Sequence, residues 1–215
     1  MKKMLALAVF AALALAQQKE LRLYTWTEYI EPAIVSDFEK ATGIKVRISY
    51  YESNEELLAK LQAGGDSQYD VIVPSDFIIP SMINLKLLMP LDKSKIPNIK
   101  NLDPKFANPP FDKGNQYTVG YLWGTVGLMY STQAFKTPPT SWSVLFDPAQ
   151  QKGRFTLMDS QREMLGIGLR YVGQSINSTD TAALKRVIDT MTAAKASKNS
   201  LGFQGGVSAT KALLA

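Results

Sequence analysis

The chain has 215 residues, of which 46% are hydrophobic and 10% aromatic, enough for one large or two modest domains with an apolar core. It carries 24 Lys and Arg against 19 Asp and Glu, a net charge of +5, but the basic residues are scattered and give little support to nucleic-acid binding. Because it has no cysteine and no histidine, disulfides, thiol and imidazole chemistry and the usual zinc sites are excluded.

The N-terminus has the pattern of a secretory signal peptide. Lys2 and Lys3 precede an apolar run of 13 residues, Met4–Ala16, that ends in small residues. A transmembrane helix needs about 20 apolar residues, so a membrane anchor is the weaker interpretation. We expect cleavage after Ala16, which leaves a net charge of +3, and a periplasmic or other extracytoplasmic location.

The first eighty residues alternate between strand and helix patterns. The predicted elements, in chain order, are a strand Glu20–Trp26, a helix Glu31–Thr42, a strand Ile44–Tyr50, a helix Glu55–Ala63 and a strand Asp70–Val73. Pro32 suits a first helical turn, Gly43 a C-terminal cap and Ser53 an N-cap. The alternation predicts parallel βαβ units, and the apolar third strand is typical of a sheet covered by helices on both faces.

The middle of the chain is less regular. A short helix is predicted over Ile79–Leu85, and a proline- and asparagine-rich surface connection follows from Pro90 to Gly114. The segment Tyr117–Tyr130 is apolar and β-rich but long for one strand, since strands usually have about 3–10 residues. Its glycines would allow a bend, so it is either two strands or a hinge between two lobes.

The second half again mixes helices and one strand. The predicted elements are helices over Ser141–Phe146, Asp159–Val172, Asp180–Ala194 and Ser208–Leu214, and a strand over Arg154–Met158. The chain stops at Ala215 inside an apolar helical run, which favours truncation over a native C-terminus.

Three segments share one plan, in which a strand is followed by polar residues and then by a helix. They are Trp26–Tyr29 (WTEY), Pro74–Phe77 (PSDF) and Asp159–Glu163 (DSQRE). In an open α/β sheet the carboxyl ends of the strands form the ligand crevice. We therefore expect the first two segments to lie side by side, with the third lining the same cleft if two lobes face each other.

The residue types suit a small organic amine. The rings of Trp26 and Tyr29 offer cation–π attraction and cover methylene groups, and Glu28 can neutralise an ammonium. Each segment also has a purely structural interpretation. Aromatic rings pack at strand ends, Ser75 and Asp76 or Asp159 and Ser160 can cap the following helices, and Glu163 can complement a helix dipole.

Catalytic interpretations are weak. The sequence has no Gly-x-Ser-x-Gly elbow, no histidine for a triad, and a Gly64–Gly65 pair that follows a predicted helix instead of opening one. A secreted hydrolase with two carboxylates is the alternative from another class. We expect a binding protein that is not an enzyme and needs no cofactor or metal.

The order and spacing of these motifs resemble the periplasmic spermidine/putrescine-binding proteins of bacterial ABC importers. The resemblance covers about Leu21 to Ala194 and is carried by Tyr24–Pro32, Phe38–Val46, Tyr51–Glu56, Tyr69–Phe77, Leu91–Pro104, Tyr121–Tyr130, Ser141–Pro148 and Asp159–Glu163. It implies an α/β, two-lobed type II periplasmic-binding-protein fold. With the signal peptide at 1–16, the first lobe would span 17–125, nearly complete, and a partial second lobe 126–215, because the family chain is longer.

The resemblance also implies roles for single residues. In the first lobe, Trp26 and Tyr29 match ring walls around a polyamine, Thr27 a polar contact, Glu28 an amine-binding carboxylate and Ser75 a cleft residue.

The remaining matches include two departures from the family. Phe77 stands where tyrosine is frequent, and Ser160 stands where some relatives have an aspartate that the neighbouring Asp159 could replace. Glu163 matches an acidic ligand of the second lobe.

The mechanism implied is capture by hinge closure and docking of a monomer on a membrane permease, with no nucleic-acid partner. A different amine, an amino acid or an iron complex is the alternative ligand. Tight binding by this short form would be unexpected.

Overall fold

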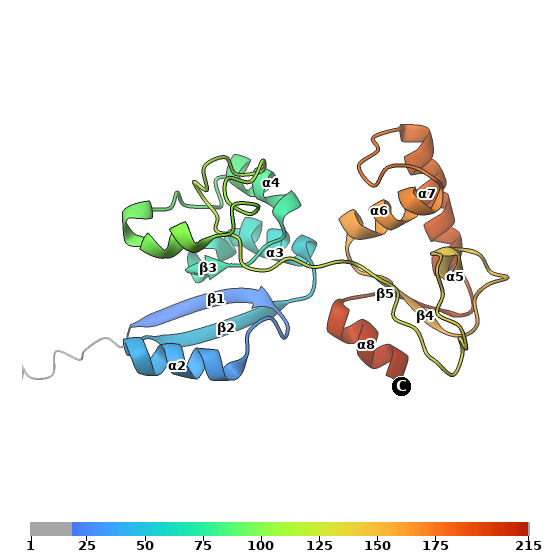
Figure 1. Ribbon diagram of the computed structural model, residues 1–215, viewed down its shortest axis with the longest axis horizontal. Coiled ribbons are helices and arrows are strands. Elements are labelled where there is room, and N and C mark those ends of the chain that lie inside the picture. Colours follow the sequence, from blue (N-terminus) through green and yellow to red (C-terminus); the bar gives the residue numbers. More distant parts are fainter. Residues whose placement is uncertain (1–18, 215) are drawn as a thin grey trace, which may run out of the picture.

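Two separate parallel sheets organise the chain. The computed structural model describes residues 19–214, so the predicted signal peptide lies outside the described residues. One sheet has three strands in the order β2-β1-β3, and the other has two, β4 and β5. Figure 1 shows the two sheets with their helices lying side by side, joined by an extended chain. We call residues 20–118 the first unit, 143–214 the second unit and 119–130 the crossing segment.

The first unit confirms the predicted βαβ alternation. Its elements are β1 (Glu20–Trp26), α2 (Pro32–Thr42), β2 (Lys45–Tyr51), α3 (Asn54–Lys60), β3 (Val71–Ile72) and α4 (Ile79–Asn84). Strand β1 pairs with β2 from Glu20↔Lys45 to Trp26↔Tyr51, and with β3 on its other side. Local signals set the boundaries: Pro32 lies in the first turn of α2, Gly43 ends α2 in the left-handed conformation, and Ser53 caps α3.

The core of the first unit lies on one side of its sheet. It is formed by Tyr24, Tyr51, Leu57, Leu61 and Met82, from β1, β2, α3, the turn after α3 and α4. Helix α2 lies on the opposite side of the sheet, below it in Figure 1, and none of its residues is buried.

The prediction that β3 is covered on both faces is wrong. Val71 remains 46% exposed. The strand has two residues, and among residues 19–214 it pairs with β1 alone, so it forms the edge of the sheet and not its centre.

The second unit has a larger core. Its elements are α5 (Ser143–Phe146), β4 (Phe155–Met158), α6 (Gln161–Tyr171), α7 (Thr181–Lys195), β5 (Ser200–Gln204) and α8 (Gly206–Leu214). Leu157, Met164, Leu169 and Val187 lie at its centre. The sequence did not predict β5, which pairs in parallel with β4 from Phe155↔Ser200 to Met158↔Gln204. No described helix is long and apolar enough to cross a membrane.

Of the two interpretations of Tyr117–Tyr130, the structure contradicts the pair of strands, and the hinge stays a prediction. These residues form no helix or strand, and Trp123 is 71% exposed. A β-rich pattern becomes a strand only when another strand pairs with its backbone. Among residues 19–214 no strand pairs with this segment.

Candidate ligand site

Trp26 and Tyr29 lie at the carboxyl end of β1. The indole Nε1 of Trp26 donates to the carbonyl oxygen of Val73 at 2.8 Å, which ties β1 to the chain just after β3. The Trp26 ring lies 4.6 Å from the Tyr51 ring and 6.0 Å from the Tyr29 ring, centroid to centroid. Tyr29 is 41% exposed. The predicted ring pair therefore exists, and its outer member remains accessible.

Glu28 occupies a special backbone conformation in this turn. Its φ is 62°, in the left-handed region that residues other than glycine rarely adopt. The amide of Tyr29 donates back to the Trp26 carbonyl oxygen at 3.4 Å, which closes the turn. The Glu28 side chain is exposed. The turn thus presents a carboxylate to solvent beside two aromatic rings.

Thr27 has a partner that the sequence analysis did not select. Its Oγ1 donates to Oε1 of Glu52 at 2.8 Å. Glu52 directly follows β2, as Thr27 directly follows β1, and the two strands pair in register up to Tyr51. The signal that could have identified Glu52 is its position, because the same edge rule that selected Trp26–Tyr29 also applies to β2.

Ser75 and Phe77 occupy the neighbouring strand end. Ser75 Oγ accepts from Nδ2 of the buried Asn54 at 3.0 Å, and the Ser75 amide donates to Asn54 Oδ1 at 2.9 Å. The Ser75 side chain does not cap the following 3-10 turn, so the capping interpretation is wrong for this residue. Phe77 is half-buried.

In the second unit, Asp159, Ser160 and Glu163 lie between β4 and the first turn of α6. The Asp159 amide donates to the carbonyl oxygen of Gln204 at 2.8 Å, and the Asp159 side chain is exposed. Ser160 is the N-cap residue of α6, but its hydroxyl donates to the Glu163 carboxylate and not to the helix backbone. Position 160 is therefore a cap by location only, and Glu163 is held in place by it.

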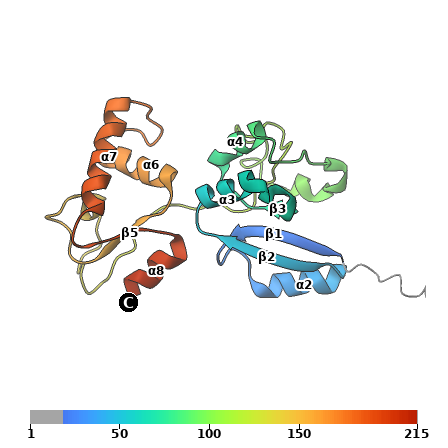
Figure 2. The same ribbon diagram turned by 180° about the vertical axis from the view of Figure 1, so that it is seen from behind.

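Two contacts link the ligand edge of the first unit to other parts of the chain, the first to the second unit and the second to the crossing segment. A Cβ placed on Gly205, which follows β5, would collide with the Glu52 carboxylate. Tyr121 donates its hydroxyl to the Tyr29 carbonyl oxygen at 2.9 Å. Figures 1 and 2 both show α8 of the second unit beside the carboxyl ends of β1 and β2.

The predicted residues nevertheless remain in two groups. Within residues 19–214, no hydrogen bond or ion pair joins Glu163 or Asp159 to Trp26, Glu28 or Tyr29. The same residues contain no group of three or more acidic side chains that could hold a metal ion.

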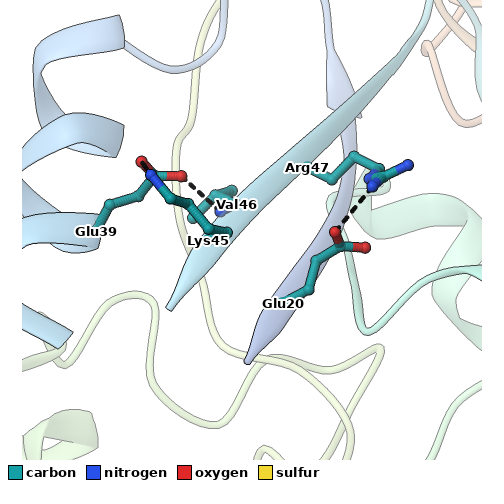
Figure 3. A pocket seen from close by; sticks show the side chains of 5 residues that line it. All are labelled: Glu20, Glu39, Lys45, Val46 and Arg47. Carbon is teal, nitrogen blue, oxygen red and sulfur yellow. Dashed lines mark hydrogen bonds and ion pairs between the residues drawn. The ribbon is translucent and has the colours of Figure 1, made fainter. Parts of the chain in front are cut away.

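A hollow at the amino ends of β1 and β2, away from the ligand edge at their carboxyl ends, does not belong to this site. It is lined by Glu20, Glu39, Lys45, Val46 and Arg47, shown in Figure 3. Lys45 pairs with Glu39 at 3.1 Å and Arg47 with Glu20 at 2.9 Å, so its charges already balance. The Val46 amide and the Lys45 ammonium, both bonded to Glu39, lower the pKa of that carboxyl.

Comparison with known proteins adds independent evidence. A family model described as "Bacterial extracellular solute-binding protein" matches residues 33–215. The spermidine/putrescine-binding periplasmic protein of Escherichia coli is 41% identical over 177 residues, which are 82% of this chain and 50% of that protein. The putrescine/cadaverine-binding protein of Pseudomonas aeruginosa is 38% identical over 204 residues, or 91% and 57% of the two chains.

A solved structure gives the same result. A putative spermidine/putrescine ABC transporter protein from Listeria monocytogenes has a TM-score of 0.77 and 39% identity, covering 86% of this chain and 57% of that one. The chain spans about half the length of the curated relatives it matches.

Proposed function

Because the chain belongs to the bacterial extracellular solute-binding protein family and has the α/β fold of type II periplasmic binding proteins, we propose that it captures a polyamine of the spermidine/putrescine class for an ABC importer. Capture requires no bond to be made or broken, so the protein acts as a carrier and not as an enzyme. Three relatives that the chain matches are named as binding proteins for spermidine, putrescine or cadaverine.

One observation carries the proposal: the exposed turn that joins two aromatic rings to a carboxylate at the sheet edge facing the second unit. Trp26 and Tyr29 suit the methylene chain of a polyamine, and Glu28 suits one of its ammonium groups. Glu163 and Asp159 are the proposed partners for a second ammonium. Desolvating a multiply charged amine is costly unless each ammonium meets an acceptor, so the spacing of the carboxylates sets selectivity.

The proposal extends to the division of the chain and its partners. Two cores, one on each side of the crossing segment, support lobes at 17–125 and 126–215. The protein works outside the cytoplasm after removal of residues 1–16, as a monomer that docks on a membrane permease. Thr27, Ser75, Phe77 and Ser160 complete the proposed ligand-contacting set.

Calorimetric titration of the purified chain tests this function. Spermidine and putrescine should give saturable heat with weaker than micromolar affinity, because the chain spans about half the length of its relatives, whereas an amino acid and an iron complex should give none. Saturable binding of one of the latter, without amine binding, would assign a different ligand. Turnover of a glycoside substrate would replace capture by the hydrolase alternative.

Replacing Glu163 with glutamine tests the site itself. Glu163→Gln removes a charge-assisted contact of roughly 1.5–3 kcal/mol, so amine affinity should fall about tenfold or more. Lys100→Gln is the control, since Lys100 is exposed in a 3-10 turn of the first unit. Equal effects of the two substitutions on the dissociation constant would remove Glu163 from the site.

A further inference from the structure

Glu52 is a carboxylate that touches both the ligand edge of the first unit and the start of α8 in the second unit. Its Oε1 accepts the Thr27 hydroxyl at 2.8 Å. Its Cβ and carboxylate lie against Gly205, where any side chain on residue 205 would collide with them. Its own backbone amide donates to Oε2 of Glu56 at 3.0 Å, which fixes the chain between β2 and α3.

The bond to Glu52 decides what Thr27 can offer a ligand. A hydroxyl has one proton and two acceptor lone pairs, and a carboxylate can only accept. Because the Thr27 proton is given to Glu52, the remaining capacity of Thr27 Oγ1 is to accept. An ammonium group carries only donors, so a threonine held as an acceptor matches an amine. A free threonine hydroxyl could instead point its own proton at the ammonium, which cannot accept it.

The contact with Gly205 extends this arrangement into the second unit. Gly205 is buried and immediately precedes α8, which has no acidic residue in its first turn. Helix N-termini carry partial positive charge and attract carboxylates. Glu52 therefore supplies from the first unit the negative charge that the start of α8 does not have in its own sequence.

We propose that Glu52 is a positioning residue of the amine site: it holds Thr27 as a hydrogen-bond acceptor and bears against the start of α8, so that the ligand edge and the second unit are fixed together. This inference rests on the proposed function. Glu52 itself need not touch the amine.

The test uses the 215-residue chain in two measurements. In the first, NMR spectra of the ligand-free protein compare Glu52→Gln with wild type. The amide signals of Thr27 and Gly205 should both shift, although these residues are far apart in sequence. Glu31→Gln is the matched control, because it removes the same charge from an exposed residue near the same turn and should leave the Gly205 signal in place. An unshifted Gly205 signal in Glu52→Gln would overturn the contact between the units.

The second measurement is a double-mutant cycle on spermidine affinity. Glu52→Met, which has a similar length but no oxygen to accept the Thr27 proton, and Thr27→Val should each weaken binding about tenfold. The double variant should be no weaker than either single variant, because both remove the same oriented acceptor. Thermal unfolding checks that Glu52→Met remains folded. Additive losses, or wild-type affinity in Glu52→Met, would overturn the inference while leaving the proposed function intact. Absence of amine binding by the wild type would instead refute the proposed function, and with it the role of Glu52 there.

Discussion

Asp112 is the most thoroughly bonded carboxylate of the described residues. It is 4% exposed and accepts the amides of Gln116, Tyr117 and Thr118 as well as the Thr118 hydroxyl. Burial alone would raise the pKa of Asp112, but the hydrogen bonds from Thr118, Tyr117 and Gln116 together lower it. The carboxylate thereby fixes the loop from which the crossing segment departs.

Asp112→Asn should destabilise the first unit in a pH-dependent way. At neutral pH the loss should be about 1–3 kcal/mol, since several buried donors lose a charged acceptor. Because the pKa is lower in the folded state, this stabilisation is present above the unfolded value of about 3.9 and disappears as the pH falls through the folded value. Urea unfolding at neutral and acidic pH measures the difference between wild type and variant. Asp66→Asn, at an exposed position, is the control, and an equal, pH-independent effect of both substitutions would contradict the role of Asp112.

Sequence reasoning found the residues of the candidate site that directly follow a strand with a clear pattern. Trp26–Tyr29 and Asp159–Glu163 could be predicted in this way because both the ends of strands and the polar residues that follow them can be recognised in the sequence alone. The hydrogen bond between Thr27 and Glu52 was not, since it depends on the register of β1 against β2. The left-handed turn at Glu28 was equally hidden, because only the three-dimensional path requires it.

Among the elements, α6 packs tightly against α7 at Gly168. A Cβ on Gly168 would meet Cγ1 of Val187, and it would lie 3.0 Å from Cε of Met191. Gly166 lies two residues earlier on the same helix. A Cβ on Gly166 would make only ordinary van der Waals contacts, with Cβ of Ile176 at 3.6 Å. The two buried glycines of α6 therefore differ in their packing. Gly168 has to be a glycine for α7 to pack against it, whereas the space around Gly166 could hold a Cβ.

This contrast gives a matched pair of substitutions. Gly168→Ala should destabilise the second unit by about 1–3 kcal/mol, since overpacking against the rigid Val187 outweighs the gain in helix propensity. Gly166→Ala should be neutral or stabilising by up to about 1 kcal/mol, because alanine favours the helix and fits the available space. Thermal denaturation compares the two variants, and a larger loss in Gly166→Ala would show that α6 and α7 pack differently.

Elements with local start and stop signals could be predicted, and elements that depend on distant partners could not. Helix α2 was delimited by Pro32 and Gly43, and α3 by Ser53. Strand β5 was missed because Gly202, with a φ of 79°, interrupts its alternation, and because its pairing with β4 is irregular. The prediction of strands in the crossing segment was wrong for the opposite reason: the segment has a β pattern, but no strand among residues 19–214 pairs with it.

At the scale of the whole molecule, two cores with hydrogen-bonded helices and strands are joined by the crossing segment, whose backbone amides donate no hydrogen bonds within residues 19–214. Between Val119 and Tyr130, no backbone amide donates a hydrogen bond to any other described residue. Both core clusters, by contrast, consist mainly of residues from helices and strands. The units thus have their own sources of stability, and the connection between them has little.

Native-state hydrogen exchange should show this difference directly. Amides of Val119–Tyr130 should exchange nearly as fast as in an unfolded chain, whereas those of β1, α6 and α7 should be protected. Mass spectrometry of peptides after timed exchange measures both regions in one experiment. Protection of the crossing segment comparable to that of β1 would mean that the segment is paired as a strand, as its sequence pattern predicted.

The order of the strands also has a consequence for how the chain folds. Strand β1 is flanked by β2 and β3, so its partners lie far along the chain: Glu20 pairs with Lys45, Leu23 with Val71, and in the other sheet Phe155 with Ser200. Parallel strands cannot be joined by a hairpin, and the entropy of closing long loops must be lost before such pairs form. Sheets of this kind form slowly compared with locally connected ones. A chain whose sheets form slowly remains unfolded for longer, which is the property that export before folding would require.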